Sequence, residues 1–144
     1  MTRRILILLC IGFAMCLPGV AEDARRDGNW WRTHERVVKL LYVTGVLDGM
    51  ELGNHLSFWG LPEKDGPVDP TLTAAASSYD KIVARYFKDV SAGELAVGLN
   101  VFYEEPLNRP ISVNDALWLV ANSMSGKTDA EMQPLIAGFR KNAK

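Results

Sequence analysis

Signals that start helices recur along this sequence. Two stretches, Ser91-Ala-Gly-Glu94 and Thr128-Asp-Ala-Glu131, are capping boxes, in which a hydroxyl and a carboxylate satisfy the free N–H groups at a helix N-terminus. Ser112-Val-Asn-Asp115 has the same spacing with an aspartate in its last position, and Asp69-Pro70 places a cap before a proline in the first helical turn. No segment alternates apolar and polar residues as a strand does. The sequence therefore predicts an all-α fold, a compact bundle of about five helices.

Short connections and one longer loop are expected to join these helices. The first helix begins after Thr33 as its N-cap, and its apolar residues between Val37 and Leu52 cover almost the whole circumference, which is typical of a helix at the centre of a bundle. Residues 22–29 are expected to be a frayed polar lead-in, and residues 54–68 a loop. The other helices are expected to run from Pro70 to about Lys88, from Ser91 to about Glu104, from Ser112 to near Met124 with Gly126 as a left-handed stop, and from Thr128 onward, with Pro134 kinking the last helix or delaying its start.

Residues 1–21 have the composition of a cleaved secretory signal. A basic pair precedes a short apolar run, and small residues lead up to a cleavage site after Ala21. Both cysteines, Cys10 and Cys16, fall inside this segment, so the mature chain is expected to have no disulfide and no thiolate metal site. We expect residues 22–144 to form a single helical domain, periplasmic or secreted, with no stable membrane insertion after cleavage of the signal.

The charge balance argues against a polyanionic partner. The chain has 16 lysines and arginines against 17 aspartates and glutamates, and two of the arginines lie in the predicted signal. Proteins that bind nucleic acid or anionic lipid concentrate positive charge on one surface. We therefore expect no nucleic acid among the partners of this protein.

Three glycines stand four residues apart in the stretch GVLDGMELG, at Gly45, Gly49 and Gly53. Each glycine inside a helix costs about 1 kcal/mol relative to alanine, so the spacing needs an explanation. A strip without side chains lets a second helix approach closely, and a strip that makes room for a ligand is the alternative. We expect close packing at Gly49 against another helix of the domain, with the helix that carries Ala116, Ala121 and Ser123 as the partner.

Acidic residues and a histidine occupy another strip of the same helix. Asp48, Glu51 and His55 follow one another at helical spacings of three and four residues, so they can share a metal ion or a proton. The alternative is a solvated helix end with no ligand. Val37 and Leu41 lie on this strip one or two turns earlier and are expected to be buried, which predicts that Asp48 is half-buried.

A buried Asp48 needs a partner, and Arg109 and Arg85 are the candidates. Arg109 lies with Asn108 in a turn flanked by prolines, where the two residues fix the angle between helices or bind a ligand directly. Trp59, in an apolar loop segment, is a further candidate for binding a partner or a ligand.

Two stretches resemble known exported proteins. The segment DGNWWRTHERVVKLLYVTGVLDG resembles the opening of a group of small exported bacterial proteins. The segment VSAGELAVGLNVFYEEPLNRPISVNDALWLV is distantly similar to the second half of the Rap1a/Tai type of type VI secretion immunity protein. The second resemblance implies a helix–loop–helix pair and a protein partner. That family typically braces its helices with cysteines, whereas residues 22–144 contain none.

These observations leave three functions open. The first is an exported protein-binding module, immunity-like, whose partner is another envelope or effector protein. The second is a metal-dependent or acid–base enzyme that uses Asp48 and Glu51. The third is a structural or small-molecule-binding envelope protein. No catalytic triad order, HExxH, CxxC, P-loop or GxGxxG pattern is present, so we favour binding over catalysis and expect no cofactor.

Overall fold

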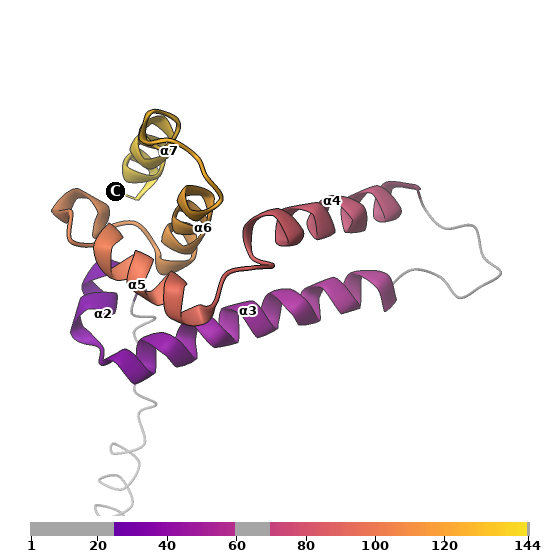
Figure 1. Cartoon of the computed structure of the whole chain (residues 1–144), viewed down its shortest axis with the longest axis horizontal. Coiled ribbons are helices and arrows are strands. Elements are labelled where there is room, and N and C mark those ends of the chain that lie inside the picture. The colour runs from indigo at the N-terminus through magenta and orange to yellow at the C-terminus, as the bar shows by residue number, and fades with distance from the viewer. Residues whose placement is uncertain (1–24, 60–69, 144) are drawn as a thin grey trace, which may run out of the picture.

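The computed structural model describes residues 25–59 and 70–143. These residues form six α-helices and a short 3₁₀ helix, with no β-strand among them, which confirms the all-α prediction (Figure 1). The predicted signal, its two cysteines and residues 60–69 lie outside the described residues. The elements are α2 (Gly28–Thr33), α3 (Arg36–Trp59), α4 (Pro70–Tyr86), α5 (Ala92–Phe102), η1 (Pro106–Asn108), α6 (Val113–Met124) and α7 (Asp129–Asn142).

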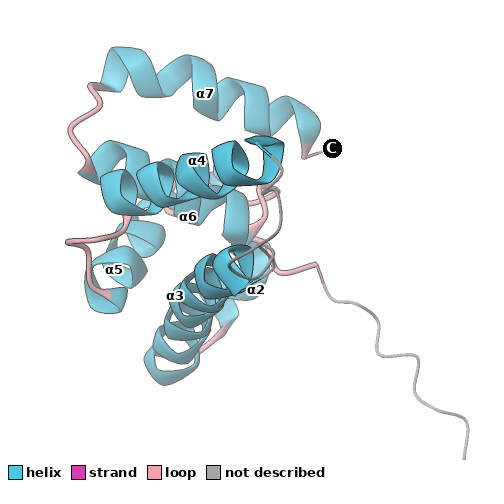
Figure 2. Ribbon diagram, turned by 90° about the vertical axis from the view of Figure 1, so that its right-hand side faces the viewer, coloured by secondary structure: helices cyan, strands magenta, loops and turns pink. Residues whose placement is uncertain are grey.

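The long helix α3 is the base on which the other helices are arranged. Its N-terminal half lies against α5, and its C-terminal half runs beside α4, away from the other helices (Figure 1). Helix α6 contacts α4, α5 and α7, and α7 packs on α6 on the side away from α3 (Figure 2). None of the helices in the described ranges is long and apolar enough to cross a membrane.

The hydrophobic core is centred on α5 and α6. It joins residues from Trp31 near the N-terminus to Ala143 near the C-terminus, so the described helices share one core. The largest fully buried side chains are Trp31, Tyr103, Leu95, Leu99, Ile111, Leu119, Val43, Val113 and Asn122.

Helix α3 differs from its prediction in two ways. Residues 54–68 were expected to form a loop, but α3 continues to Trp59, because Gly53 keeps a helical φ and no proline interrupts the chain before residue 60. It was also expected at the centre of the bundle, yet Val43 is the only fully buried side chain among its described residues. Val37 and Leu41, expected to be buried, are 63% and 68% exposed.

The predicted caps of α5, α6 and α7 are confirmed, whereas Asp69, the predicted cap of α4, lies outside the described residues. Both capping boxes are complete: Ser91 Oγ accepts from the N–H of Glu94 at 3.2 Å, and Thr128 Oγ1 accepts from that of Glu131 at 3.4 Å. Ser112 caps α6, and its Oγ accepts from the N–H of Asp115 at 3.2 Å. Gly126 has the positive φ expected of a left-handed stop, at 95°. Pro134 lies inside α7 without delaying its start, because α7 already begins at Asp129.

The N-terminal lead-in is more ordered than its polar sequence predicts. Asp27 caps α2 by accepting from the N–H groups of Asn29 at 2.8 Å and Trp30 at 3.2 Å. Thr33 is the last residue of α2 and not a cap, because its hydroxyl donates back to the Trp30 carbonyl. The N–H of Gly28 donates to the carbonyl of Arg109 at 2.9 Å, which ties this segment to the turn before α6.

Candidate functional site

The glycine strip of α3 does not mediate a helix crossing. Among the described residues, a Cβ built at Gly45 or Gly49 meets no heavy atom within 4 Å, and one at Gly53 meets only the Tyr79 hydroxyl, at 3.5 Å. The prediction of close packing at Gly49 is therefore wrong. The close crossing occurs at Gly98 of α5, where a Cβ would come within 2.5 Å of Val120 Cγ1 on α6.

The acidic strip of α3 lies on the surface. Asp48 is exposed and not half-buried, because Val37 and Leu41 on the same strip are themselves exposed. Glu51 and His55 form a contact of 3.8 Å between carboxylate and imidazole, both largely exposed. Over the described ranges no three histidine, cysteine, aspartate or glutamate side chains gather as a group that could hold a metal ion. The strip thus presents one solvated pair and one separate carboxylate.

Asn108 and Arg109 join three parts of the chain. The buried side chain of Asn108 donates from Nδ2 to the carbonyl of Phe102 at 2.7 Å, and its Oδ1 accepts from Arg140 Nε at 2.9 Å. It therefore links the end of α5 to α7. Arg109 is half-buried, and its Nε makes no hydrogen bond within the described part of the chain. The structure brings neither Arg109 nor Arg85 into an ion pair with Asp48, all three of which it describes.

The aromatic candidates separate into core and surface. The side chain of Trp59 lies outside the described residues, although its backbone ends α3. Trp31 is fully buried and donates from its indole to Asn100 Oδ1 at 2.9 Å. The ring of Trp30 lies on that of His34, with ring centroids 4.2 Å apart, and His34 is half-buried.

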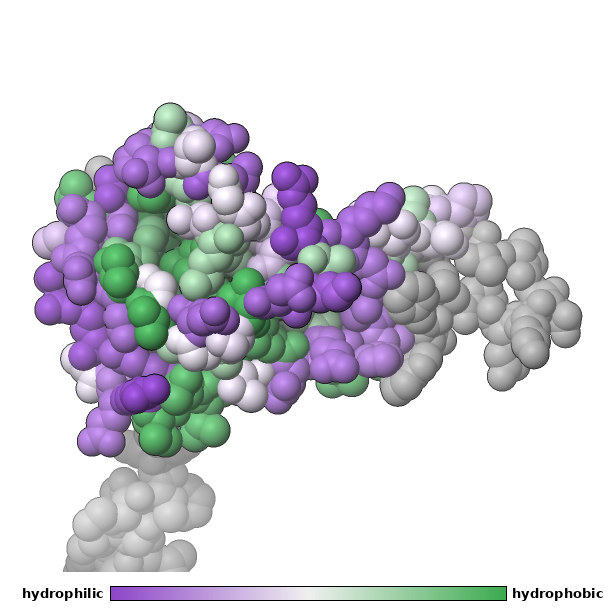
Figure 3. Space-filling model, in the orientation of Figure 1, coloured by the Kyte–Doolittle hydropathy of each residue, from purple (hydrophilic) through white to green (hydrophobic). Residues whose placement is uncertain are grey.

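A concave apolar surface lies between α5, α6 and α7, and we call it the α5–α6–α7 groove. Its volume is about 310 Å³, at the lower end of the range of small-molecule pockets. Figure 3 shows this face of the molecule, where hydrophobic side chains gather in a hollow between α5 and α7. The groove is lined by Gly98, Val101 and Phe102 of α5, by Leu119, Val120, Ser123 and Met124 of α6, and by Asp129, Met132, Gln133 and Ile136 of α7.

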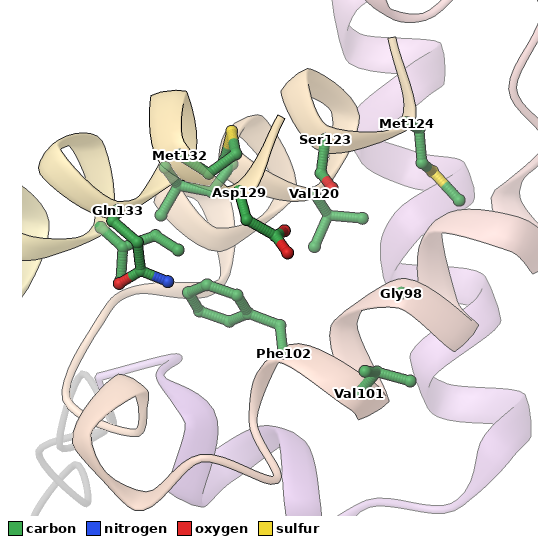
Figure 4. A pocket seen from close by; sticks show the side chains of 11 residues that line it. Gly98, Val101, Phe102, Val120, Ser123, Met124, Asp129, Met132 and Gln133 are labelled. Atoms are coloured by element: carbon green, nitrogen blue, oxygen red, sulfur yellow. The ribbon is translucent and has the colours of Figure 1, made fainter. Parts of the chain in front are cut away.

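Close packing within the fold shapes this groove. Because Gly98 has no side chain, α5 and α6 approach closely at one end of it. Phe102 projects from α5 toward α7, opposite Gln133 (Figure 4). Val101 is 61% exposed at the edge of the groove. The result is an apolar surface that the described helices leave partly uncovered.

Few polar groups face this groove, and Asp129 carries its only negative charge among the lining residues. Its carboxylate points into the space between Val120 and Phe102 (Figure 4). Asp129 is the first residue of α7, where the helix dipole also stabilises an acid. Ser123 and Gln133 supply the remaining side-chain hydrogen-bonding groups. The arrangement suits an apolar ligand that carries one cation.

Sequence reasoning missed this groove. Its walls come from three helices, and the faces that they turn toward each other cannot be read from one helix alone. One local signal was available, because α5 is apolar on nearly all sides although it is only 11 residues long. A helix of that kind buries one face in the core and leaves the apolar side chains of its other face exposed, as Val97 and Val101 are here.

Comparison with known proteins adds no relative. No protein-family model matches the sequence, and no curated protein or solved structure shows significant similarity to it. The resemblance of residues 90–120 to the immunity family stays a prediction from the sequence.

Proposed function

We propose that the protein is an exported binding module that holds an amphipathic helical segment of a partner protein in the α5–α6–α7 groove. The observation that carries the proposal is the apolar concavity of about 310 Å³ built by three helices. Amphipathic helices bind by laying an apolar face into such grooves. Met124 and Met132 suit this role, because flexible thioether side chains adapt to differently shaped residues.

Charge selects among apolar segments. A carboxylate beside an apolar surface favours a ligand that brings a lysine or arginine to it, since an ion pair replaces the water lost on binding. Asp129 occupies that position in the groove. The proposed partner segment therefore has apolar residues at i, i+3 or i+4, and i+7, with one basic residue beside them.

Two sequence features support an exported protein partner. The stretch that resembles the immunity family, residues 90–120, includes α5 and α6, which form two of the three groove walls. The signal-like composition of residues 1–21 supports a periplasmic or secreted location. An envelope or effector protein is the partner class that fits both features.

The enzyme alternative has less support. Asp48 and Glu51 are exposed, whereas acid–base or metal catalysis relies on groups in a partly desolvated site. A small-molecule function shares the groove with the proposed one, so the experiment below distinguishes the two ligands.

Peptide selection tests the proposal. The purified protein is immobilised, and binders are selected from a displayed library of short random peptides. We expect enriched peptides to share helically spaced apolar residues and a lysine or arginine. Val101→Asn should weaken their binding by about tenfold or more, because it places an uncharged polar side chain at the apolar edge. Val37→Asn is the matched control, since Val37 is 63% exposed on α3 and does not line the groove.

The selection has outcomes that contradict the proposal. Failure to enrich any peptide would contradict a peptide-binding groove. Equal loss of binding in Val101→Asn and Val37→Asn would place the contact elsewhere. If small organic cations bind in a manner that depends on Asp129 while no peptide does, the small-molecule function replaces the proposed one.

A further inference from the structure

A second concavity, of about 150 Å³, lies between α3 and α5 and is separate from the α5–α6–α7 groove. Arg36, Lys39 and Asn100 form its polar side, and Leu40, Ala96 and Val97 form its apolar side. We call it the Asn100 pocket. Its polar side chains come from two helices that meet near the N-terminal end of α3 (Figure 1).

The side-chain amide of Asn100 has a fixed orientation. Its Oδ1 accepts two hydrogen bonds, from the indole Nε1 of Trp31 at 2.9 Å and from Lys39 Nζ at 3.0 Å. Both acceptor positions of the oxygen are therefore used inside the protein. The Nδ2 group, with two N–H donors, makes no hydrogen bond to any residue that the structure describes, and Asn100 is exposed.

The two cations of the pocket are not neutralised. Lys39 is half-buried. Its ammonium lies 5.4 Å from the ring centroid of Trp31 and donates a hydrogen bond to Asn100 Oδ1. Neither Lys39 nor Arg36 forms an ion pair with a carboxylate of the described chain. The carboxylate of Glu94, which belongs to the same helix as Asn100, is held by the N–H and hydroxyl of Ser91. The polar side of the pocket thus offers hydrogen-bond donors and positive charge without a competing acid.

We propose that the Asn100 pocket binds a carboxylate that carries a short aliphatic chain. The carboxylate oxygens would accept from Asn100 Nδ2 and pair with Arg36 and Lys39, because a charge-assisted hydrogen bond is stronger than a neutral one. The aliphatic chain would lie on Leu40, Ala96 and Val97. Two sources supply this chemistry, a free short-chain carboxylic acid and the C-terminal carboxylate of a peptide that ends in an aliphatic residue.

Titration by NMR tests this site. The indole Nε1–H signal of Trp31 reports on the pocket, because that proton is bonded to Asn100 Oδ1. We expect sodium butyrate to shift this signal saturably, with a dissociation constant of about millimolar order for so small a ligand. An acetylated dipeptide ending in a free valine should bind more tightly than butyrate if the source is a peptide, and less tightly if it is a free acid. The valine amide and butylamine are controls that should not bind.

Asn100→Asp is the sharpest variant. It keeps an oxygen to accept from Trp31 and Lys39, but it replaces the outward donor by an anionic oxygen, so binding should weaken by about tenfold or more. Asn114→Asp makes the same charge change where Oδ1 accepts from Tyr42 instead, at 2.9 Å, and should leave binding unchanged. Arg36→Gln is a second test, and because Arg36 is exposed the substitution should leave the core intact. It should weaken binding several-fold. Equal binding of butyrate and butylamine, or full binding by Asn100→Asp, would overturn the proposal.

Discussion

The ring of Tyr103 lies directly against the backbone of Gly28. A Cβ built at Gly28 would come within 2.6 Å of Tyr103 Cε1 and 2.8 Å of the Arg109 Cα. Both neighbours are fixed, since Tyr103 is fully buried and its hydroxyl donates to the carbonyl of Ile111 at 3.0 Å. This contact brings the N-terminal segment, the end of α5 and the turn before α6 together.

Gly28→Ala should therefore destabilise the fold. The added methyl group meets a backbone atom and a buried ring, and overpacking of this kind costs typically 1 to 3 kcal/mol or more. Urea unfolding measures the loss. Gly93→Ala is the control, because a Cβ there meets only Ser91 Oγ, at 3.8 Å. A Gly28→Ala protein as stable as the wild type would contradict the close approach.

Gly49→Ala should stabilise the protein. The position is in the interior of α3, and a Cβ there meets no atom of the described chain within 4 Å, so the gain in helix propensity of up to about 1 kcal/mol is not offset by a clash. Gly98→Ala should destabilise the protein, because the added Cβ would lie 2.5 Å from Val120 Cγ1. Val120 cannot easily move away, since a β-branched side chain in a helix has few other rotamers. The two unfolding midpoints should shift in opposite directions. A loss of stability at Gly49 would indicate a packing partner on that face.

Tyr103→Phe should cost about 1 to 3 kcal/mol, since it leaves the carbonyl of the buried Ile111 without its hydroxyl donor. Tyr42→Phe is the comparison, because its hydroxyl donates to the exposed Asn114 and water can replace it. Burial raises the pKa of the Tyr103 hydroxyl above its ordinary value of 10.0. The contribution of this group to stability is therefore present below the unfolded-state pKa and is lost as the pH rises above it. When the free energy of unfolding in urea is measured at increasing alkaline pH, it should fall less steeply for Tyr103→Phe than for the wild type. The same pH dependence in both proteins would contradict the burial of the hydroxyl.

Acid should weaken the two capping boxes. The Ser91 hydroxyl and backbone N–H lower the pKa of the Glu94 carboxyl, and the Thr128 backbone N–H and hydroxyl lower that of Glu131. A lowered folded-state pKa gives a contribution that is present above the unfolded-state pKa and is lost as the pH falls through the folded-state value. The stability difference between the wild type and the double variant Glu94→Gln, Glu131→Gln should shrink on acidification. A difference that stays constant from neutral to acidic pH would show that the carboxylates do not cap as charged groups.

Local signals predicted the starts of α4, α5, α6 and α7 correctly, but not those of α2 and α3. A cap such as Ser91 or Thr128 acts through backbone groups two or three residues away, so its effect can be read from the sequence. The burial of α3 could not be read in the same way. An apolar run shows that a helix has apolar faces, but it does not show whether enough other helices exist to cover them. In this chain α5 covers one end of α3 and α4 the other, and Leu41 remains exposed.

The glycines show the same limit. Spacing identified Gly45, Gly49 and Gly53 as a strip, while the described positions where a close neighbour leaves no room for a Cβ are Gly28 and Gly98, which belong to no pattern. Tyr103 leaves no room for a Cβ at Gly28, and Val120 of α6 leaves none at Gly98 of α5. Both neighbours are distant in sequence from the glycine that they contact. The groove depends on the same long-range placement, because Asp129 and Phe102 lie on different helices.

Methyl NMR of the methionines tests the α5–α6–α7 groove most directly. Met124 and Met132 line the groove, whereas Met50 lies in a separate concavity formed by α3, α4 and α6. A short amphipathic peptide of leucine and lysine is added to protein labelled at the methionine methyl groups. The proposed function predicts that the Met124 and Met132 signals shift with one saturation curve while the Met50 signal stays in place, and that Asp129→Asn weakens the affinity. A shift of Met50 without Met124 and Met132, or no saturable shift of either groove methionine, would contradict it.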